Sequence, residues 1–194
     1  MKKILVKSFN ESYSEQKCSI SQRQGIITCI PKEGKSKYSL KNWRPITLLN
    51  VDLKICSAVI SNRLKPVLVD LISQTQKGFL KGRYIGECTR LIFDLIEKLE
   101  EDDIPVLLVL LAFEKAFDTV EWSFLYQTLQ FFGFGESFCS WIKTFYNDIM
   151  SYIIDNGHCS DYFKLGRVGR QGVPLSPYLF ILVLLLLSTA LRKW

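Results

Sequence analysis

Residues 105–113 (PVLLVLLAF) form an unbroken apolar run, and this run constrains the fold of the 194-residue chain more than any other segment. An apolar run of strand length is typical of a β-strand that is covered on both faces. Helical patterns lie on both sides of it, so the sequence predicts an α+β fold in which 105–113 is a central strand. Neither this run nor the apolar segment 178–191 reaches the ~20 residues of a membrane span, so no membrane partner is predicted.

The remaining elements follow from turn residues and from the spacing of apolar side chains. Residues 25–31 and 43–49 are predicted to pair as a β-hairpin around the charged turn 32–42. A second hairpin is predicted over 151–165, because Asn156-Gly157 favours a tight turn. Apolar residues at helical spacing predict helices over 50–71, 85–100, 120–132, 136–150 and 176–192. Residues 1–24 are polar and weakly periodic, which indicates a partly helical arm.

Charge is distributed unevenly along the chain, whose net charge is +6. Residues 1–92 carry 17 basic and 6 acidic side chains, a net charge of +11, whereas residues 93–194 have a net charge of −5. Such a division suggests a groove for a polyanion that is lined by the first half of the chain. Ordinary solvated lysines explain the charge alone equally well.

The six cysteines and the single histidine, His158, do not form a zinc motif, because no cysteine pair has the CxxC spacing. We therefore predict no metal ligands of this type and mostly buried, reduced thiols. The chain also begins without the long apolar segment of a secretory signal. These features predict an intracellular protein, cytoplasmic or nuclear.

Three segments contain side chains that suit phosphate chemistry. Residues 112–120 (AFEKAFDTV) place Glu114 and Asp118 between a predicted strand and a helix, although a solvated Glu114 and an Asp118 in the N-terminal turn of the helix are the favoured interpretation. Residues 169–180 (GRQGVPLSPYLF) resemble a loop facing a phosphate or base, or simply a helix entry. The lysine-rich turn 32–42 is a plausible phosphate clamp, and a solvated turn remains the alternative.

Taken in order, these blocks resemble one family over about residues 20–192. The blocks are IPKEGK, NWRPITLLNVDLKI, LISQTQKGFLKGR, LLAFEKAFDTVEW and GRVGRQGVPLSPYLFILV. Their order and spacing are similar to the fingers and palm of the reverse transcriptases of non-LTR (LINE-type) retrotransposons. The resemblance implies a right-hand polymerase fold with an N-terminal arm (1–24), a fingers lobe (25–103) and a partial palm (104–194) without a thumb.

The resemblance also implies roles for individual residues. Contacts to an incoming deoxynucleoside triphosphate are implied for Lys32, Arg44, Arg83, Phe117 and Gln171, with Phe117 as the gate that rejects a ribose 2′-hydroxyl. Contacts to the template backbone are expected for Lys35, Lys37, Lys41, Lys81 and Arg170. The implied partners are RNA, RNA–DNA duplex and the triphosphate, and the family's cofactor is Mg²⁺.

The chain departs from the family pattern at its metal site. Ala112 stands where the family has a metal-binding Asp, and the chain ends before the Asp-Asp hairpin of the palm. Two-metal phosphoryl transfer requires carboxylates that hold both ions ~4 Å apart. We therefore predict a reverse transcriptase fragment that does not bind Mg²⁺ productively and is inactive. The alternatives are a non-catalytic RNA- or DNA-binding remnant and a degenerate retroelement product with no selected function.

Overall fold

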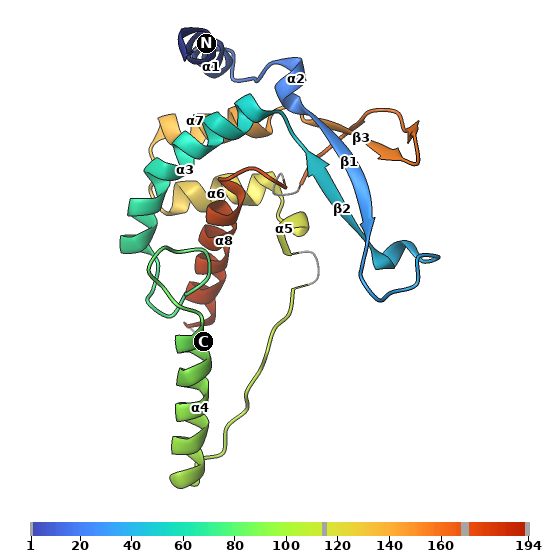
Figure 1. Ribbon diagram of the computed structural model, residues 1–194. Helices are drawn as coiled ribbons and strands as arrows, with labels where there is room; N and C mark the ends of the chain where they lie inside the picture. Colours follow the sequence, from blue (N-terminus) through green and yellow to red (C-terminus); the bar gives the residue numbers. More distant parts are fainter. Residues whose placement is uncertain (1, 114–115, 168–170, 193–194) are drawn as a thin grey trace.

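The computed structural model describes residues 2–113, 116–167 and 171–192 (Figure 1). The described chain consists of helices and one mixed β-sheet, so the prediction of an α+β fold is confirmed. The helices are α1 (Lys2–Ser14), α2 (Ile20–Arg23), α3 (Val51–Leu71), α4 (Gly86–Glu101), α5 (Ala116–Thr119), α6 (Trp122–Phe131), α7 (Glu136–Tyr146) and α8 (Ser176–Leu191), with a 3₁₀ turn at Leu40–Asn42. The strands are β1 (Gln24–Pro31), β2 (Trp43–Leu48), β3 (Met150–Asp155), β4 (His158–Cys159) and β5 (Phe163–Lys164).

The sheet combines strands from the two ends of the chain. Its order is β2-β1-β3-β4, and β5 also pairs with β3. The predicted hairpin β1–β2 is confirmed and is antiparallel, with Ile26 opposite Leu48. β3 runs parallel to β1, with Tyr152 opposite Ile26. The second hairpin is also confirmed, and the positive φ angles of Asn156 (47°) and Gly157 (80°) form its turn.

The prediction of a central strand at 105–113 is wrong. The segment is not part of any strand in the described chain, and its side chains are exposed, Leu107 by 87% and Leu110 by 79%. The hairpin 151–165, which was expected near it, pairs with β1 instead. An apolar run acquires a strand's hydrogen bonds only from a neighbouring strand. Among the described residues, none pairs with this run.

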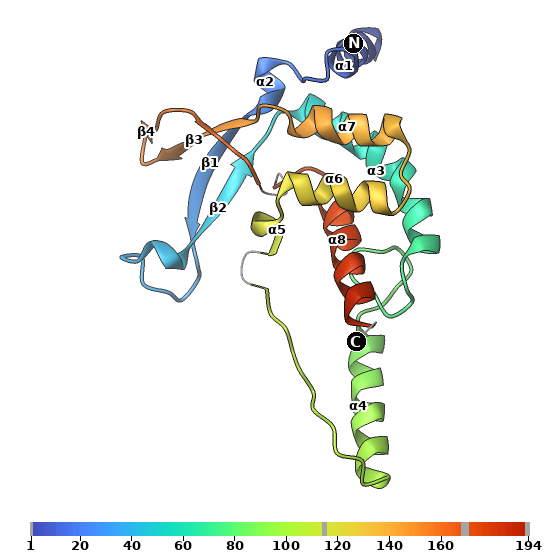
Figure 2. The same ribbon diagram turned by 180° about the vertical axis from the view of Figure 1, so that it is seen from behind.

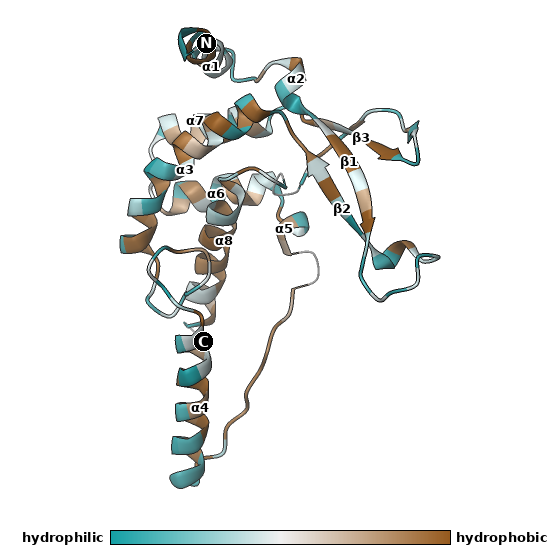
Figure 3. Ribbon diagram, in the orientation of Figure 1, coloured by the Kyte–Doolittle hydropathy of each residue, from teal (hydrophilic) through white to brown (hydrophobic). Residues whose placement is uncertain are grey.

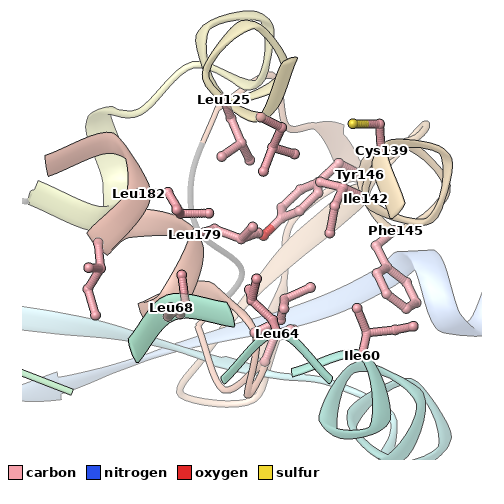
Figure 4. Packing of buried hydrophobic residues seen from close by; sticks show 14 of the residues in the cluster. Ile60, Leu64, Leu68, Leu125, Cys139, Ile142, Phe145, Tyr146, Leu179 and Leu182 are labelled. Carbon is pink, nitrogen blue, oxygen red and sulfur yellow. The ribbon is translucent and has the colours of Figure 1, made fainter. Parts of the chain in front are cut away.

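The core lies between α3, α6, α7 and α8 (Figures 1 and 2). Leu64 and Leu68 of α3 point towards Leu179 and Leu182 of α8, and Ile142 of α7 closes the cluster (Figure 4). Each of these five side chains is at least 97% buried. Complete burial of such a side chain contributes about 1.5–3 kcal/mol, so this cluster stabilises the arrangement of the four helices.

Helix α4 projects away from that core, and none of its residues is buried (Figure 1). It nevertheless has an amphipathic pattern, and three of its apolar residues, Leu91, Phe93 and Leu95, are more than half exposed. The same apolar character continues through the extended segment 104–113 that follows α4 (Figure 3). Helix α4 and the segment 104–113 together contain many of the exposed large apolar side chains of the described chain.

The predicted N-terminal arm packs on α7 and on the turn before β3. Tyr13 of α1 contacts Trp141 of α7, with ring centroids 4.9 Å apart. Asp148 accepts salt bridges from Lys17 at 2.8 Å, from Lys164 at 3.0 Å and from Arg23. The hydrogen bonds from the two lysines lower the pKa of the Asp148 carboxyl well below its ordinary value of 3.8. Residues 2–23 are therefore fastened to the rest of the molecule.

No disulfide joins the six cysteines, all of which lie in described residues, but the prediction of mostly buried thiols is wrong, because only Cys18 and Cys139 are buried. Partial burial raises the pKa of the Cys56 thiol to about 12, so this thiol is protonated near neutral pH. Within the described ranges, no helix is both long and apolar enough to cross a membrane.

Candidate functional site

The tip of the β1–β2 hairpin, residues 32–42, is held by side chains that bond to its own backbone. The Asn42 amide donates a hydrogen bond to the Ser36 carbonyl at 2.8 Å. The Trp43 indole N–H donates to the Lys37 carbonyl at 2.9 Å. These two bonds connect the end of the turn to its middle, so the backbone of the tip is held by hydrogen bonds within the loop.

The lysines of the predicted phosphate clamp lie together on this tip. The Lys32 ammonium donates a hydrogen bond to the Lys41 carbonyl at 2.8 Å, which fixes Lys32 against the 3₁₀ turn (Leu40–Asn42) that contains Lys41. Lys35 and Lys37 are exposed on the turn between them. Lysines that are clustered and solvent-accessible attract phosphate groups through an interaction that weakens with salt.

A cleft of about 880 Å³ lies between the hairpin and the segments around α5 and Gln171. Lys32 and Lys41 line it from the hairpin and Gln171 lines it from the loop before α8, so three predicted contacts share one cleft. Its volume is within the range of ligand pockets in proteins, roughly 300–1,000 Å³. The remaining lining residues are Ile27, Leu40, Trp43, Pro45, Thr47, Asp118 and Leu165.

The alternation of β2 decides which of its side chains reach the cleft. Trp43, Pro45 and Thr47 line it, and successive strand residues point to opposite faces of a sheet. Arg44 lies between the first two and therefore points to the other face of the strand, where it is exposed. The structure thus brings Lys32 and Gln171 to one cleft and places Arg44, which was expected to join them, behind it.

The loop after Gln171 lies directly against β2 and α3. Gly172 has a φ angle of +82°, and a Cβ atom on it would stand 3.8 Å from the Thr47 carbonyl oxygen and 3.7 Å from Lys54 Cε. A side chain at this position would be strained by the positive φ angle. Buried Val173 and Leu175 hold the rest of the loop in the core. The amide of Gln171 is therefore presented to the cleft from a fixed backbone.

The guanidinium of Arg83, an expected nucleotide contact, bonds to backbone carbonyls of the chain itself. Its guanidinium donates to the carbonyls of Ser73 at 2.6 Å, Gln76 at 2.7 Å, Ile72 at 2.9 Å and Val69 at 3.3 Å. These carbonyls belong to the end of α3 and the loop that follows it. A cation at a helix C-terminus also interacts favourably with the helix dipole. The guanidinium consequently holds the loop 72–83 together.

Phe117, the expected gate residue, is half-buried between two other aromatic rings. Its ring centroid lies 4.4 Å from that of Phe180 in α8 and 6.1 Å from that of Phe79, which it meets edge-on. Offset and edge-on pairs at such distances are favourable arrangements. The ring connects the short helix α5 to α8 and to the segment before α4. Its neighbour Asp118, rather than Phe117, lines the cleft.

Ala112 and Lys81 lie away from this lining. Ala112 is exposed near the end of the extended segment 104–113, and Lys81 is exposed in the loop before α4. Arg170 and Glu114 fall outside the described residues. Ala112 has no side-chain oxygen, so it cannot ligate Mg²⁺.

The described cleft residues do not fit a two-metal centre. Asp118 is the one carboxylate in the cleft lining that the structure describes, and Lys32 and Lys41 share that lining. Within 2–113, 116–167 and 171–192, no group of three or more His, Cys, Asp or Glu side chains could hold a metal ion. Two bridged ions require several carboxylates, so no catalytic step through Mg²⁺ follows from this arrangement.

None of the seven remaining lining residues was predicted from the sequence as a ligand contact. Among them, Asp118 was interpreted as a residue in the first turn of a helix, and Trp43 was assigned to a strand without a functional role. The alternating strand pattern could have grouped Trp43 with Pro45 and Thr47 on one face. No sequence signal indicates which face of β2 borders the cleft, because that depends on where the distant segment containing Gln171 packs.

Comparisons with known proteins show one family for most of the chain. Residues 30–194 match the family model described as "Reverse transcriptase (RNA-dependent DNA polymerase)". The chain is 34% identical over 183 residues, 94% of its length, to the "Transposon TX1 uncharacterized 149 kDa protein" of Xenopus laevis. It is 30% identical over 160 residues, 81% of its length, to the "Retrovirus-related Pol polyprotein from type-1 retrotransposable element R2" of Popillia japonica.

A third relative belongs to the same group. The chain is 26% identical over 155 residues, 80% of its length, to the "Retrovirus-related Pol polyprotein from type-2 retrotransposable element R2DM" of Drosophila melanogaster. The matched region covers 14%, 22% and 14% of these three relatives, in the order given. The chain therefore spans less than a quarter of each of these proteins.

Proposed function

Because the chain belongs to the reverse transcriptase (RNA-dependent DNA polymerase) family, with non-LTR retrotransposon proteins among its relatives, we propose that it binds nucleic acid and deoxynucleoside triphosphate without catalysing polymerisation. The observation that carries this proposal is the convergence of Lys32, Lys41 and Gln171 on one cleft. The two ammonium groups suit phosphates, and the amide suits a base or sugar edge. The apolar wall of Trp43 and Pro45 suits the face of a nucleobase.

The proposed binding is weak and independent of sequence. Lysines recognise phosphates as point charges and carry no base information. Lys35 and Lys37 extend the positive surface beyond the cleft, so an RNA strand or RNA–DNA duplex is the proposed macromolecular partner. A Kd of roughly 10⁻⁴–10⁻⁶ M at physiological salt is typical of this kind of contact. Such partners agree with the expected intracellular location, cytoplasmic or nuclear.

The absence of catalysis is proposed from Ala112. The family position for a metal-binding Asp is occupied by a methyl group, and Asp118 is the one carboxylate in the described lining of the cleft. Phosphoryl transfer through two metal ions loses several kcal/mol of transition-state stabilisation when a bridging ligand is removed, and each ~1.4 kcal/mol is a factor of ten in rate. We also retain the division into arm (1–24), fingers lobe (25–103) and palm segment (104–194) as part of this proposal.

The binding proposal is tested with a labelled, blunt RNA–DNA duplex at a series of salt concentrations. We expect the slope of log K against log salt to be steep for the native chain and smaller by roughly 2 for Lys32→Gln/Lys41→Gln. The matched control is Lys2→Gln/Lys3→Gln, which removes the same charge from α1, away from the hairpin (Figure 1). Equal slopes for the two double variants would contradict a binding site at the cleft.

Catalysis is tested separately, by extension of a primer on an RNA template in Mg²⁺. We expect no product from the native chain beyond that of a heat-denatured sample. Mg²⁺-dependent extension that is lost in Gln171→Ala would show that the chain is a polymerase and that the assignment of Ala112 is mistaken.

A further inference from the structure

The tip of the β1–β2 hairpin displays an aromatic ring whose exposure the fold does not require. Tyr38 has a relative exposure of 103%, so its ring contacts almost nothing in the molecule. A ring of this size normally contributes to stability by burying its surface. Full exposure of this tyrosine leaves its ring available for contact with another molecule.

The exposure of Tyr38 is a consequence of the loop's construction. The residue before it has its carbonyl bonded to the Trp43 indole N–H at 2.9 Å, and the Ser36 carbonyl is bonded to the Asn42 amide at 2.8 Å. The Tyr38 N–H itself donates to Ser36 Oγ at 3.4 Å. The backbone is held at Ser36 and Lys37, directly before Tyr38, and the ring extends outward from it. Little backbone entropy therefore remains to be lost on binding.

The surroundings of the ring are basic. Lys35 and Lys37 precede it in the sequence and are exposed, and Lys41 lies at the end of the same turn. Positive side chains next to an accessible aromatic ring are the arrangement by which proteins hold single-stranded nucleic acid: the cations follow the backbone and the ring stacks on a base. A duplex offers the ring no unstacked base, because its bases are already paired and stacked.

We propose that Tyr38 is a stacking platform that gives the hairpin tip a preference for single-stranded nucleic acid over duplex. This rests on the proposed function, since the phosphate contacts of the same basic hairpin bring the strand to the ring. It goes beyond that function because lysines alone do not distinguish a single strand from a duplex. Stacking is tolerant of sequence, so the preference is for an unpaired base and not for a particular one.

The experiment uses three labelled probes of equal length with the full chain: a single-stranded dT 12-mer, an abasic 12-mer with the same phosphates and no bases, and a blunt RNA–DNA duplex. We expect the native chain to bind the dT strand more tightly than the abasic strand. Tyr38→Ala should weaken binding of the dT strand ~5–10-fold, as loss of one stacked base predicts, and leave the other two probes unchanged. Tyr38→Phe retains the ring and should bind as the native chain does.

Two further variants separate the stacking from charge and from a general loss of aromatic surface. Lys35→Gln should weaken all three probes and lower their salt dependence, because it removes a phosphate contact. Tyr162→Ala removes another exposed tyrosine, which packs on Tyr152 and follows Asp161, and should change none of the affinities. Circular dichroism of each variant verifies that the chain is folded.

The possible results separate this proposal from the proposed function. If the duplex and the abasic strand bind in a salt-dependent way and Tyr38→Ala leaves the dT strand unchanged, the stacking proposal is overturned and the phosphate-binding cleft stands. If none of the three probes binds, the proposed function fails and the stacking proposal fails with it. An equal loss on all three probes in Tyr38→Ala would show that the ring supports the loop rather than a base.

Discussion

Phe117 packs its ring against that of Phe180, with centroids 4.4 Å apart and ring planes inclined by 36°. The first residue belongs to α5 at the edge of the cleft, and the second belongs to α8 in the helical core. The contact therefore fixes the segment that carries Asp118 relative to the loop that carries Gln171. The position of two cleft residues depends on one aromatic pair.

Removal of this ring should affect stability and the cleft together. We expect Phe117→Ala to lower the free energy of unfolding by roughly 2 kcal/mol, which is less than for a fully buried ring because Phe117 is half-buried. Phe117→Tyr retains the ring contact and should cost little. Urea unfolding monitored by circular dichroism measures the free energy of unfolding of both variants. A native-like midpoint for Phe117→Ala would contradict the structural role of the pair.

Arg83 provides a second prediction, because its guanidinium reaches four carbonyl oxygens. A lysine has one compact ammonium group and cannot reproduce the planar fork of donors. We expect Arg83→Lys to lower the free energy of unfolding by roughly 2 kcal/mol, since carbonyls of the loop 72–83 lose their partners. Faster hydrogen exchange confined to residues 69–83 would locate the effect. Unchanged stability combined with a loss of nucleotide binding would instead indicate that Arg83 contacts a ligand.

The carboxyl of Asp148 provides a prediction about pH. Its pKa is lowered in the folded chain by hydrogen bonds from Lys17 and Lys164, so the folded state favours the ionised form. The resulting stabilisation is fully present above the ordinary pKa of 3.8 and is lost as the pH falls towards the lowered folded pKa. We expect α1 to become more susceptible to an acid-active protease as the pH falls through this range.

The matched control for that titration is Asp148→Asn, which keeps the shape of the side chain and removes its charge. In this variant α1 should already be susceptible to proteolysis near neutral pH, and a fall in pH should increase the cleavage only slightly. If the native chain and Asp148→Asn respond to acid identically, then the ion pairs of Asp148 with Lys17 and Arg23 do not anchor the arm.

The exposed run 104–113 should govern the solubility of the chain. An uncharged apolar segment without strand partners is a site for association between copies of a protein. We expect Leu107→Lys/Leu110→Lys to shift the sample towards a monodisperse state in dynamic light scattering. Both side chains are more than three-quarters exposed, so the urea midpoint should hardly change. A large loss of stability would show that the run is packed against the molecule.

The sequence alone determined the elements whose signals are local. The hairpin β1–β2, the turn at Asn156-Gly157 and the helices α3, α4, α6 and α8 follow from patterns within a few residues, because turn chemistry and side-chain periodicity act over that distance. Helix α7 was predicted to extend to residue 150 but ends at Tyr146, because Met150 begins β3. Lys32 and Lys41 also lie close together because both belong to the turn of one predicted hairpin.

Only the tertiary structure decided the relationships between distant segments. The parallel pairing of β1 with β3, the position of Gln171 opposite Trp43 and the exposed state of 105–113 all depend on which segments become neighbours after folding. Arg83 has the same charge whether it faces phosphates or the carbonyls of its own loop, so its role is a property of the packed backbone. An apolar run favours burial, but the strands and helices that would bury it and pair with it belong to other parts of the chain.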